Sequence, residues 1–374
     1  MNSNNYRDYG LRGRWLAWRN RVLASLRFQR FAQRFPLTRP IARRRARALF
    51  DLVAGFTYSQ ILAACIQTGL LELLAAGPCD TATVAARLDL PTAGAERLLR
   101  AATALGLVEP LGSGWALGSD GAALRGNPGI GEMIAHHHLL YADLADPVAL
   151  LRRGGGGGAL SQHWHYAEAA GQGDSADVAA YSALMAASQP LVAAQALDAY
   201  AFGRHQRLLD VGGGEGAFVR AVAARVARLE LALFDLPAVA ERARRAFESA
   251  GLGGRTTVFG GDFLADPLPT GYDIVSLIRV LHDHDDAPAL ALLRRIHAAL
   301  PPGGTLFIAE PMAQTPGAEP AGDAYFGFYL LAMGSGRPRS TGEIRGMLST
   351  AGFSTSRVLP TAMPLTANVI VAIR

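Results

Sequence analysis

The chain has 374 residues, half of them hydrophobic, which is enough for two domains with a sizeable apolar core. Its two cysteines exclude a disulfide framework and predict a reducing compartment, so we expect a cytoplasmic protein. The net charge of +5 is unevenly distributed, because residues 1–47 hold thirteen arginines and a single acidic residue, Asp8. The rest of the chain is acidic.

Residues 1–47 are predicted to form a basic arm. Trp15, Trp18, Val22 and Leu26 recur at helical spacing among the arginines, which predicts an amphipathic helix. This helix could cover its own protein or a dimer partner, lie on an anionic membrane surface, or contact nucleic acid. No signal-peptide pattern is visible in it.

Residues 48–128 are predicted to form a winged-helix module. Helices at 82–90 and 95–106 flank a proline turn, and two short strands around a glycine turn complete the wing. The second helix is mostly apolar, which favours packing against protein over DNA binding. We therefore expect a homodimer formed through residues 48–200 and no nucleic-acid partner. The uncharged segment 52–71 is long enough to span a membrane, but its polar groups favour a buried helix.

Residues 129–200 are predicted to form a helical connection that contributes to a substrate pocket. Five consecutive glycines at 154–158 predict a flexible loop within it. The histidines at 136–138, 163 and 165 lack the spacing of a helical metal site, so we expect no metal. We expect these histidines to line or flank the pocket.

Residues 208–218 predict a nucleotide-binding loop. A short apolar run suits a buried parallel strand, and the glycines after it allow close backbone approach to a ligand at the start of a helix. Gly212 and Gly214 fit both the dinucleotide fingerprint and the glycine-rich loop of S-adenosylmethionine (SAM) binders. This loop alone does not distinguish the two cofactors.

Strands and helices alternate from residue 201 to residue 374, which predicts a doubly wound α/β sheet of seven strands. The strands are expected at 208–211, 231–235, 257–262, 273–280, 305–310, 356–359 and 368–373. Open sheets of this kind bind ligands at the carboxyl ends of their strands.

Acidic residues follow these strands where a cofactor would lie. Asp235 ends the second strand, and a carboxylate there accepts hydrogen bonds from the ribose hydroxyls of either NAD or SAM. Asp262 and Phe263 follow the third strand and suit the amino group and the ring of adenine. A single sheet leaves no second half for a nicotinamide, so we favour SAM.

His282 and Glu310 are the predicted catalytic residues. His282 lies in LHDHDD, at 281–286, after the fourth strand, and a histidine suits removal of a proton from an attacking oxygen. Glu310 ends the neighbouring strand and is expected to accept the other imidazole N–H. Asp285 or Asp286 is expected to cap the next helix.

Five motifs together resemble the SAM-dependent O-methyltransferases of the caffeate and acetylserotonin type: LDVGGG at 209–214, FDLP at 234–237, GDF at 261–263, LHD at 281–283 and LPPGG at 300–304. The resemblance covers most of the chain and implies a winged-helix dimerisation domain followed by a Rossmann-like methyltransferase domain at 201–374. It implies His282 as general base, with Glu310 as its support. The implied SAM contacts are Asp210, Gly212, Gly214, Asp235, Leu236, Asp262, Phe263 and Arg279.

Two positions depart from that family pattern. Pro338 occupies the place of a second supporting glutamate in plant relatives, and Arg279 lies one position closer to the histidine than their basic residue. The third member of a catalytic triad is therefore undetermined.

The arm and the stretches 35–50 and 279–286 are similar to those of bacterial carotenoid O-methyltransferases that act on hydroxyneurosporene and demethylspheroidene. The implied acceptor is the tertiary hydroxyl of an acyclic carotenoid of the spheroidene or spirilloxanthin type. We expect a cytoplasmic protein, for which peripheral contact of the arm with the inner or photosynthetic membrane is one alternative. Alternatives are a methyltransferase of bacteriochlorophyll or polyketide biosynthesis, or a winged-helix regulator that senses SAM.

An apolar acceptor pocket is predicted along a helix over residues 324–333. Phe326, Tyr329 and Met333 are expected to line it, with Met185 on the opposite wall. Gly327 within the helix and Gly334 after it stand where a sealed core would need bulk, which favours a pocket.

Overall fold

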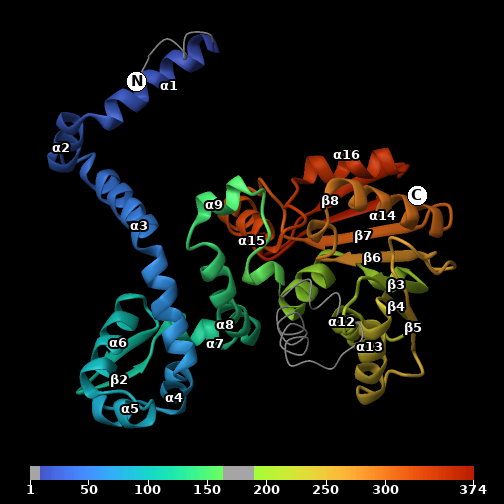
Figure 1. The fold of residues 1–374 in the computed structure, drawn as a ribbon, viewed down its shortest axis with the longest axis horizontal. Helices are drawn as coiled ribbons and strands as arrows, with labels where there is room; N and C mark the ends of the chain where they lie inside the picture. The colour runs from blue at the N-terminus through green and yellow to red at the C-terminus, as the bar shows by residue number, and fades with distance from the viewer. Residues whose placement is uncertain (1–8, 163–188) are drawn as a thin grey trace. The chain divides into compact units, whose positions relative to one another are not determined.

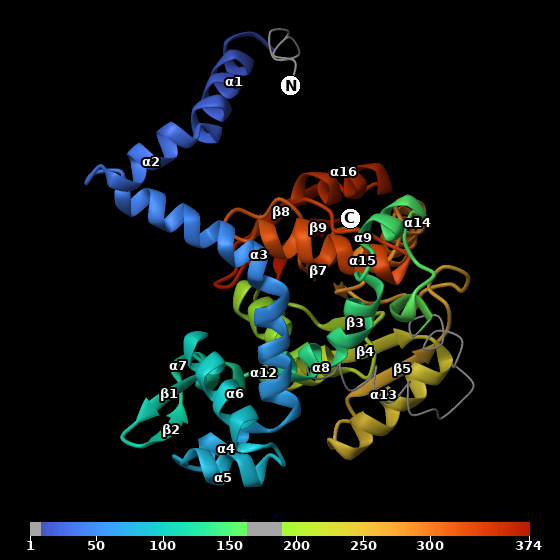
Figure 2. The ribbon, with the colours of Figure 1, turned by 60° about the vertical axis from the view of Figure 1, so that its left-hand side comes forward.

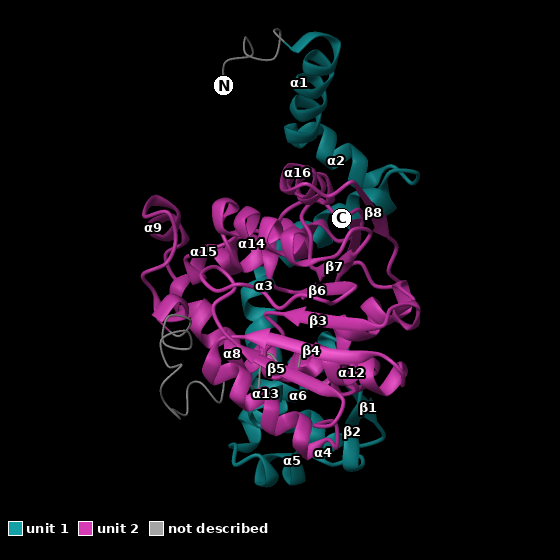
Figure 3. Ribbon diagram, turned by 90° about the vertical axis from the view of Figure 1, so that its right-hand side faces the viewer, with its two compact units in different colours: residues 1–118 teal, residues 119–374 magenta. Residues whose placement is uncertain are grey.

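The computed structural model describes residues 9–162 and 189–374. The chain divides into two compact units, residues 1–118 and 119–374 (Figure 3). The first unit therefore ends directly after the predicted wing, ahead of the boundary expected at residue 128. Met185, His163 and His165 lie outside the described residues.

The first unit contains the arm and the winged-helix module (Figure 1). Its helices are α1 (Gly10–Ala24), α2 (Leu26–Arg34), α3 (Arg39–Gln67), α4 (Leu70–Ala76), α5 (Thr81–Arg87) and α6 (Thr92–Ala104), and its strands are β1 (Val108–Leu111) and β2 (Gly114–Leu117). β1 and β2 pair antiparallel, and α5 packs against α6. The predicted winged-helix outline is confirmed.

The predicted arm helix is interrupted at Ser25. This residue is extended, and its side chain accepts the N–H of Phe28, so α1 ends and α2 begins there. The apolar series from Trp15 to Leu26 therefore spans two helices. α3 follows and continues without a break into the winged-helix module, so the boundary expected at residue 47 falls inside a helix (Figure 2).

α3 exposes a row of large apolar side chains. Leu52, Val53 and Phe56 are 82%, 72% and 74% exposed, so this part of the chain is not the buried helix that the sequence predicts. Within residues 9–162 and 189–374, α3 is also the one helix that is long and apolar enough to cross a membrane. A row of large exposed apolar side chains of this kind marks a site of association.

The second unit is built on a seven-stranded sheet with helices on both faces (Figure 3). Its strands are β3 (Arg207–Val211), β4 (Glu230–Asp235), β5 (Thr256–Gly260), β6 (Ile274–Ile278), β7 (Thr305–Glu310), β8 (Thr355–Leu359) and β9 (Asn368–Ile373). Its helices are α7 (Ser119–Arg125), α8 (Pro128–Asp143), α9 (Pro147–Arg152), α12 (Ala217–Arg225), α13 (Pro237–Ser249), α14 (Asp286–Ala299), α15 (Gly327–Met333) and α16 (Thr341–Ala351). Shorter helical segments are η2 (Phe202–Arg204), η3 (Leu281–Asp283) and the π-helix η4 (Pro320–Phe326).

The strand order is β5-β4-β3-β6-β7-β9-β8. β9 runs antiparallel to the other six strands, which are parallel to one another. The predicted doubly wound sheet of seven strands is confirmed. The chain turns outward in opposite directions from β3 and β6, and the crevice at the carboxyl ends of two such strands is where open sheets bind ligands.

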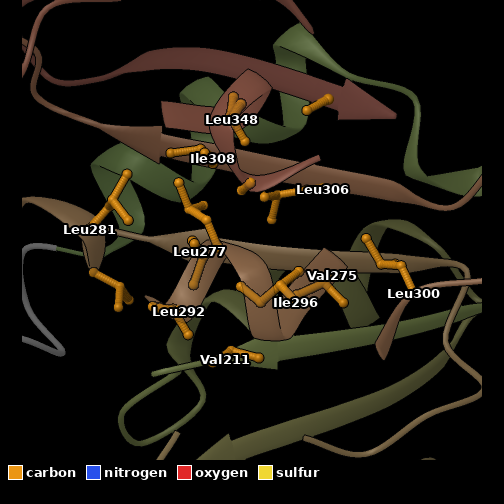
Figure 4. Close-up of a cluster of buried hydrophobic side chains, with 14 of the residues drawn as sticks. Val211, Val275, Leu277, Leu281, Leu292, Ile296, Leu300, Leu306, Ile308 and Leu348 are labelled. Carbon is orange, nitrogen blue, oxygen red and sulfur yellow. The ribbon is translucent and has the colours of Figure 1, made fainter. Parts of the chain in front are cut away.

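Apolar side chains fill both faces of this sheet. On one face, Leu292 and Ile296 of α14 and Leu348 of α16 pack over Leu277 and Leu306 of the strands (Figure 4). On the other face, α12 and α13 cover a second apolar cluster. Burial on both faces explains why these strands are continuously hydrophobic, and it holds their carboxyl ends in a rigid row.

The five-glycine run does not form the predicted flexible loop. The N–H of Gly156 donates to the carbonyl of Leu331 at 2.9 Å, and a Cβ on Gly155 would lie 2.5 Å from that oxygen. Asp143 accepts two backbone N–H groups just after the run, at 2.7 and 2.9 Å. Gly155 and Gly156 pack closely on Leu331 and Gly334, in and just after α15, and all of residues 154–157 have positive φ angles, which favour glycine.

Candidate active site

The glycine loop between β3 and α12 has the shape of a cofactor cradle. Gly212 and Gly214 have φ angles of +69° and +58°, a conformation that glycine adopts without strain. A Cβ on Gly212 would lie 2.8 Å from Val280, whereas a Cβ on Gly214 would meet nothing within 4 Å. Open space at the start of a helix fits a bound cofactor.

Asp235, at the end of β4, faces this loop. Its two carboxylate oxygens accept the N–H groups of Gly214 and Leu236, each at 2.7 Å. Burial raises the pKa of Asp235 to about 6 against the effect of these two bonds. Each oxygen keeps a further lone pair, so the carboxylate can also accept the ribose hydroxyls of SAM.

Asp210, at the end of β3, lies beneath the same loop. Its Oδ1 accepts the hydroxyl of Ser276 at 2.6 Å, while Oδ2 has no partner among the described residues. Burial raises the pKa of Asp210 to about 7. A buried carboxyl oxygen without a partner is rare in proteins, and a charged donor of a ligand would satisfy it.

The remaining predicted cofactor residues follow β5 and β6. Oδ1 of Asp262 accepts the backbone N–H of Leu264, two residues later. The rings of Phe263 and His284 lie edge-on to each other, with their centroids 5.3 Å apart. Arg279 has a φ of +58°, an uncommon conformation for a residue with a side chain. All eight predicted cofactor residues therefore lie at or shortly after the carboxyl ends of β3, β4, β5 and β6.

His282 is buried in η3, directly after β6, and is 2% exposed. Its Nε2 lies 3.2 Å from Oδ1 of Asp283, and its Nδ1 has no partner within the described part of the chain. The Asp283 carboxylate favours the tautomer with hydrogen on Nε2, which leaves the Nδ1 lone pair available. The centroid of the Phe326 ring lies 5.7 Å from that of the His282 imidazole. The contact with Asp283 is one that the sequence does not predict, although Asp283 is the next residue.

Burial, with two nearby arginines, keeps the His282 imidazole neutral. Burial, followed by Arg279, Arg339 and His284, lowers the pKa of His282 to about 3. His282 therefore offers an uncharged, proton-accepting ring at neutral pH.

Glu310 supports His282 through the backbone. Its Oε2 accepts the backbone N–H of His282 at 3.2 Å, and its Oε1 has no partner in the residues described. The predicted contact with the imidazole N–H is not the one observed, because β7 ends beside the backbone of η3 and Asp283 takes the ring. Burial raises the pKa of Glu310 to about 8, so it carries a proton at neutral pH.

Arg339 is a fully buried residue that no sequence pattern predicts. Its guanidinium donates to the carbonyls of Leu281 and His284 at 2.8 and 2.7 Å, on either side of His282. Pro338, which departs from the pattern of the plant relatives, directly precedes Arg339. The partners lie 55 and 58 positions earlier in the chain, and an arginine in a glycine- and proline-rich segment carries no signal of burial.

The predicted helix cap takes a different form. Asp285 occupies the N-cap of α14, but its Oδ1 accepts the N–H of Gly336 at 3.0 Å and no N–H of the helix. Asp286 accepts from Arg337 and Arg339. Both carboxylates therefore join this loop to the segment after α15.

The predicted acceptor helix consists of the π-helix η4 followed by α15. Nε2 of His136 lies 3.1 Å from the Tyr329 hydroxyl, and Nε2 of His137 lies 2.7 Å from the Tyr325 hydroxyl, so α8 joins this wall. Phe326 lies beside His282. π-Helical turns are frequent at functional sites.

Met333 and Gly334, which were also expected at the acceptor pocket, are explained by packing. Met333 is 3% exposed and belongs to an apolar cluster with Leu140 and Leu160. Gly334 ends α15 with a φ of +98°, and a Cβ there would lie 3.0 Å from Gly156. Its lack of bulk therefore serves close backbone packing and is not a sign of a pocket.

Across residues 9–162 and 189–374, no group of three or more His, Cys, Asp or Glu side chains could hold a metal ion.

Comparison with known proteins matches both parts of the chain. Residues 141–354 match the O-methyltransferase domain and residues 50–116 the O-methyltransferase dimerisation domain. Demethylspheroidene O-methyltransferase of Cereibacter sphaeroides is 44% identical, over 95% of this chain and 94% of that protein. Acetylserotonin O-methyltransferase of Mus musculus is 31% identical, over 83% and 84%. The structure of PigF with SAH superposes with a TM-score of 0.70 at 25% identity, covering 88% of this chain and 99% of that one. The chain therefore belongs to the SAM-dependent O-methyltransferases that carry a dimerisation domain ahead of the catalytic domain.

Proposed function

We propose that this enzyme transfers a methyl group from SAM to the tertiary hydroxyl of an acyclic hydroxycarotenoid, with His282 as general base. The observation that carries the catalytic role is the buried, neutral imidazole with an unpartnered Nδ1 within the described residues, at the ligand-binding edge of the sheet. The 44% identity to demethylspheroidene O-methyltransferase supports the acceptor class.

SAM, when bound, supplies an electrophilic methyl group on a sulfonium. The glycine loop and Asp235 would hold its ribose end, and Asp262 and Phe263 would hold its adenine. Nδ1 of His282 would accept the hydroxyl proton of the acceptor as the acceptor oxygen takes the methyl carbon and the bond from that carbon to sulfur breaks, which would leave S-adenosylhomocysteine. An alkanol is far less acidic than a phenol, so proton removal accompanies methyl transfer. Asp283, at Nε2, stabilises the imidazolium that results.

A second candidate is a phenolic acceptor of the polyketide type. The wall formed by η4 and α15 is not wholly apolar, because Tyr325 and Tyr329 present hydroxyls that bind histidines of α8. Such polar groups would suit an acceptor with several oxygens.

An acceptor panel tests these two candidates. The full-length enzyme is incubated with SAM and 1-hydroxyneurosporene, demethylspheroidene or a catechol, and the products are analysed by mass spectrometry. We expect methyl ethers of the two carotenoids. Methylation of the catechol alone would overturn the carotenoid proposal and favour the phenolic one.

Replacement of the base tests its role separately. His282→Ala should lower turnover by roughly 10²- to 10⁴-fold and leave the SAM dissociation constant unchanged, because a positioned base acts on the chemical step. His138→Ala, at an exposed position of α8, is the matched control and should keep full turnover. Turnover near wild type in His282→Ala would place the base elsewhere.

We further propose that the arm brings the enzyme to an anionic membrane surface, where an apolar acceptor would be held. Trp15 and Trp18 are 54% and 59% exposed among the arginines of α1. Each basic residue near such a surface contributes about 1 kcal/mol, a term that salt weakens. We expect flotation with phosphatidylglycerol liposomes, but not with phosphatidylcholine liposomes, and its loss on deletion of residues 2–34. Unchanged flotation of the deletion variant would show that the arm is structural.

A further inference from the structure

Four consecutive carbonyls around the catalytic histidine accept hydrogen bonds from one short segment, residues 335–339, which we call the strap. The bonds run from Arg339 Nη1 to Leu281 at 2.8 Å, from the Arg337 N–H to His282 at 2.9 Å, from the Ser335 hydroxyl to Asp283 at 3.1 Å, and from Arg339 Nη2 to His284 at 2.7 Å. The whole of η3 is therefore held from one side.

The strap is itself held at its carboxyl end. The carbonyl of Arg339 accepts the N–H of Ala313, just after β7, at 3.0 Å. Ser340 then begins α16 with a capping box to Glu343. Gly336 has a φ of +76°, and a Cβ there would lie 2.2 Å from the carbonyl oxygen of His282. The strap and η3 are thus in direct backbone contact at the catalytic residue.

Arg339 is the central member of the strap. Its side chain is 0% exposed, and burying a charge is costly unless hydrogen bonds and a counter-charge compensate. Two carbonyls of η3 and its flank, with the Asp286 carboxylate at 2.8 Å, provide this compensation. A guanidinium reaches these partners at once because its donors form a planar fork, which a lysine ammonium does not have.

We propose that Arg339 is a positioning residue for methyl transfer, which holds η3 so that the His282 imidazole meets the acceptor oxygen. This inference rests on the proposed role of His282 as base. A displacement of about 1 Å at a reacting group can lower the rate by about 10²-fold, so control of η3 affects turnover directly.

The test variant is Arg339→Lys in the full-length enzyme, which keeps the charge and removes the fork. We expect kcat to fall by about 10- to 100-fold, with the KM for demethylspheroidene and the dissociation constant for SAM within about twofold of wild type. Arg345→Lys is the matched control, because Arg345 is an exposed residue of α16 outside the strap, and its side chain donates to Ser356 and to none of the four carbonyls. It should leave kcat within about twofold of wild type.

A double-mutant cycle separates positioning from general structural damage. In a His282→Ala background, Arg339→Lys should leave the residual rate of radiolabelled methyl transfer unchanged, because the group that it positions is gone. An equal fall in both backgrounds would overturn the positioning role, while the loss caused by His282→Ala alone would still support the base. Full turnover in His282→Ala would overturn the base and, with it, the positioning role.

Ser335→Ala extends the test if Arg339→Lys does not fold, as judged by circular dichroism. Ser335 is exposed, and the variant removes only the hydrogen bond to the Asp283 carbonyl. We expect kcat to fall by about two- to tenfold in the wild-type background and not at all in the His282→Ala background. An unchanged kcat in the wild-type background, or an equal fall in both, would refute the inference.

Discussion

The ionisation of Glu310 is expected to make turnover depend on pH. Its buried carboxyl has a pKa of about 8, and loss of its proton places a negative charge at the backbone of His282, where it favours the imidazolium formed during catalysis. We expect kcat/KM to rise with pH through about 8 and Glu310→Gln to abolish this rise. The control Glu319→Gln, at an exposed carboxylate, should keep it. An identical pH profile for wild type and Glu310→Gln would contradict this prediction.

The same carboxyl links stability to pH. The pKa of Glu310 is raised from 4.5 to about 8 in the folded chain, so between these values the folded chain holds a proton that the unfolded chain has released. The stabilisation is fully present below pH 4.5 and is lost as pH rises through about 8. Urea unfolding at pH 6 and pH 9 should therefore show a smaller loss of stability for Glu310→Gln than for wild type. Equal losses would mean that folded Glu310 is already ionised at pH 6.

Single residues also show where sequence-based prediction ends. The positions of His282 and Glu310 were predictable because each follows a buried strand, and parallel strands bring their carboxyl ends to one edge. The contacting atoms were not predictable, since the His282 ring contacts Asp283 while Glu310 accepts the backbone N–H of His282. The hydrogen-bond partners of Arg339 lie 55 and 58 positions earlier in the chain, and no local sequence pattern predicts a contact at that separation.

Elements were predictable where their signal is local. The sheet follows from apolar runs and turn residues, and its strands lie close to their predicted ranges. The glycine run has no side chains, so its sequence resembles a linker, and only its packing on Leu331 shows that it is a structural contact. The break at Ser25 depends on a single side-chain cap.

The packing of the glycine run makes a prediction at the scale of elements. Gly154→Ala and Gly155→Ala both place a side chain at positive φ, which costs about 1–2 kcal/mol. At Gly154 the new Cβ meets open space, whereas at Gly155 it meets the Leu331 carbonyl at 2.5 Å. Urea unfolding should therefore show a further loss of about 1–3 kcal/mol for Gly155→Ala. Equal stability of the two variants would mean that the run does not support α15.

At the scale of the whole molecule, the exposed face of α3 requires a partner. Leu52, Val53 and Phe56 lie within residues 50–116, the part that matches the dimerisation domain. Large exposed apolar groups gathered on one helix face mark a site of protein association. We infer that this face is covered by a second copy of the chain, so that the enzyme is a homodimer.

Charge placed on this face should separate the subunits. Leu52→Glu combined with Phe56→Glu would bury two carboxylates in the contact, and an unpaired buried charge costs several kcal/mol. At micromolar concentration, light scattering should give twice the chain mass of 39.5 kDa for wild type and the single chain mass for the variant. Arg47→Glu, at an exposed position about 180° around α3 from Phe56, is the control and should stay dimeric. The variant should still bind SAM, because the predicted cofactor residues all lie in residues 119–374. A wild-type monomer, or a variant that remains dimeric, would remove α3 from the subunit contact.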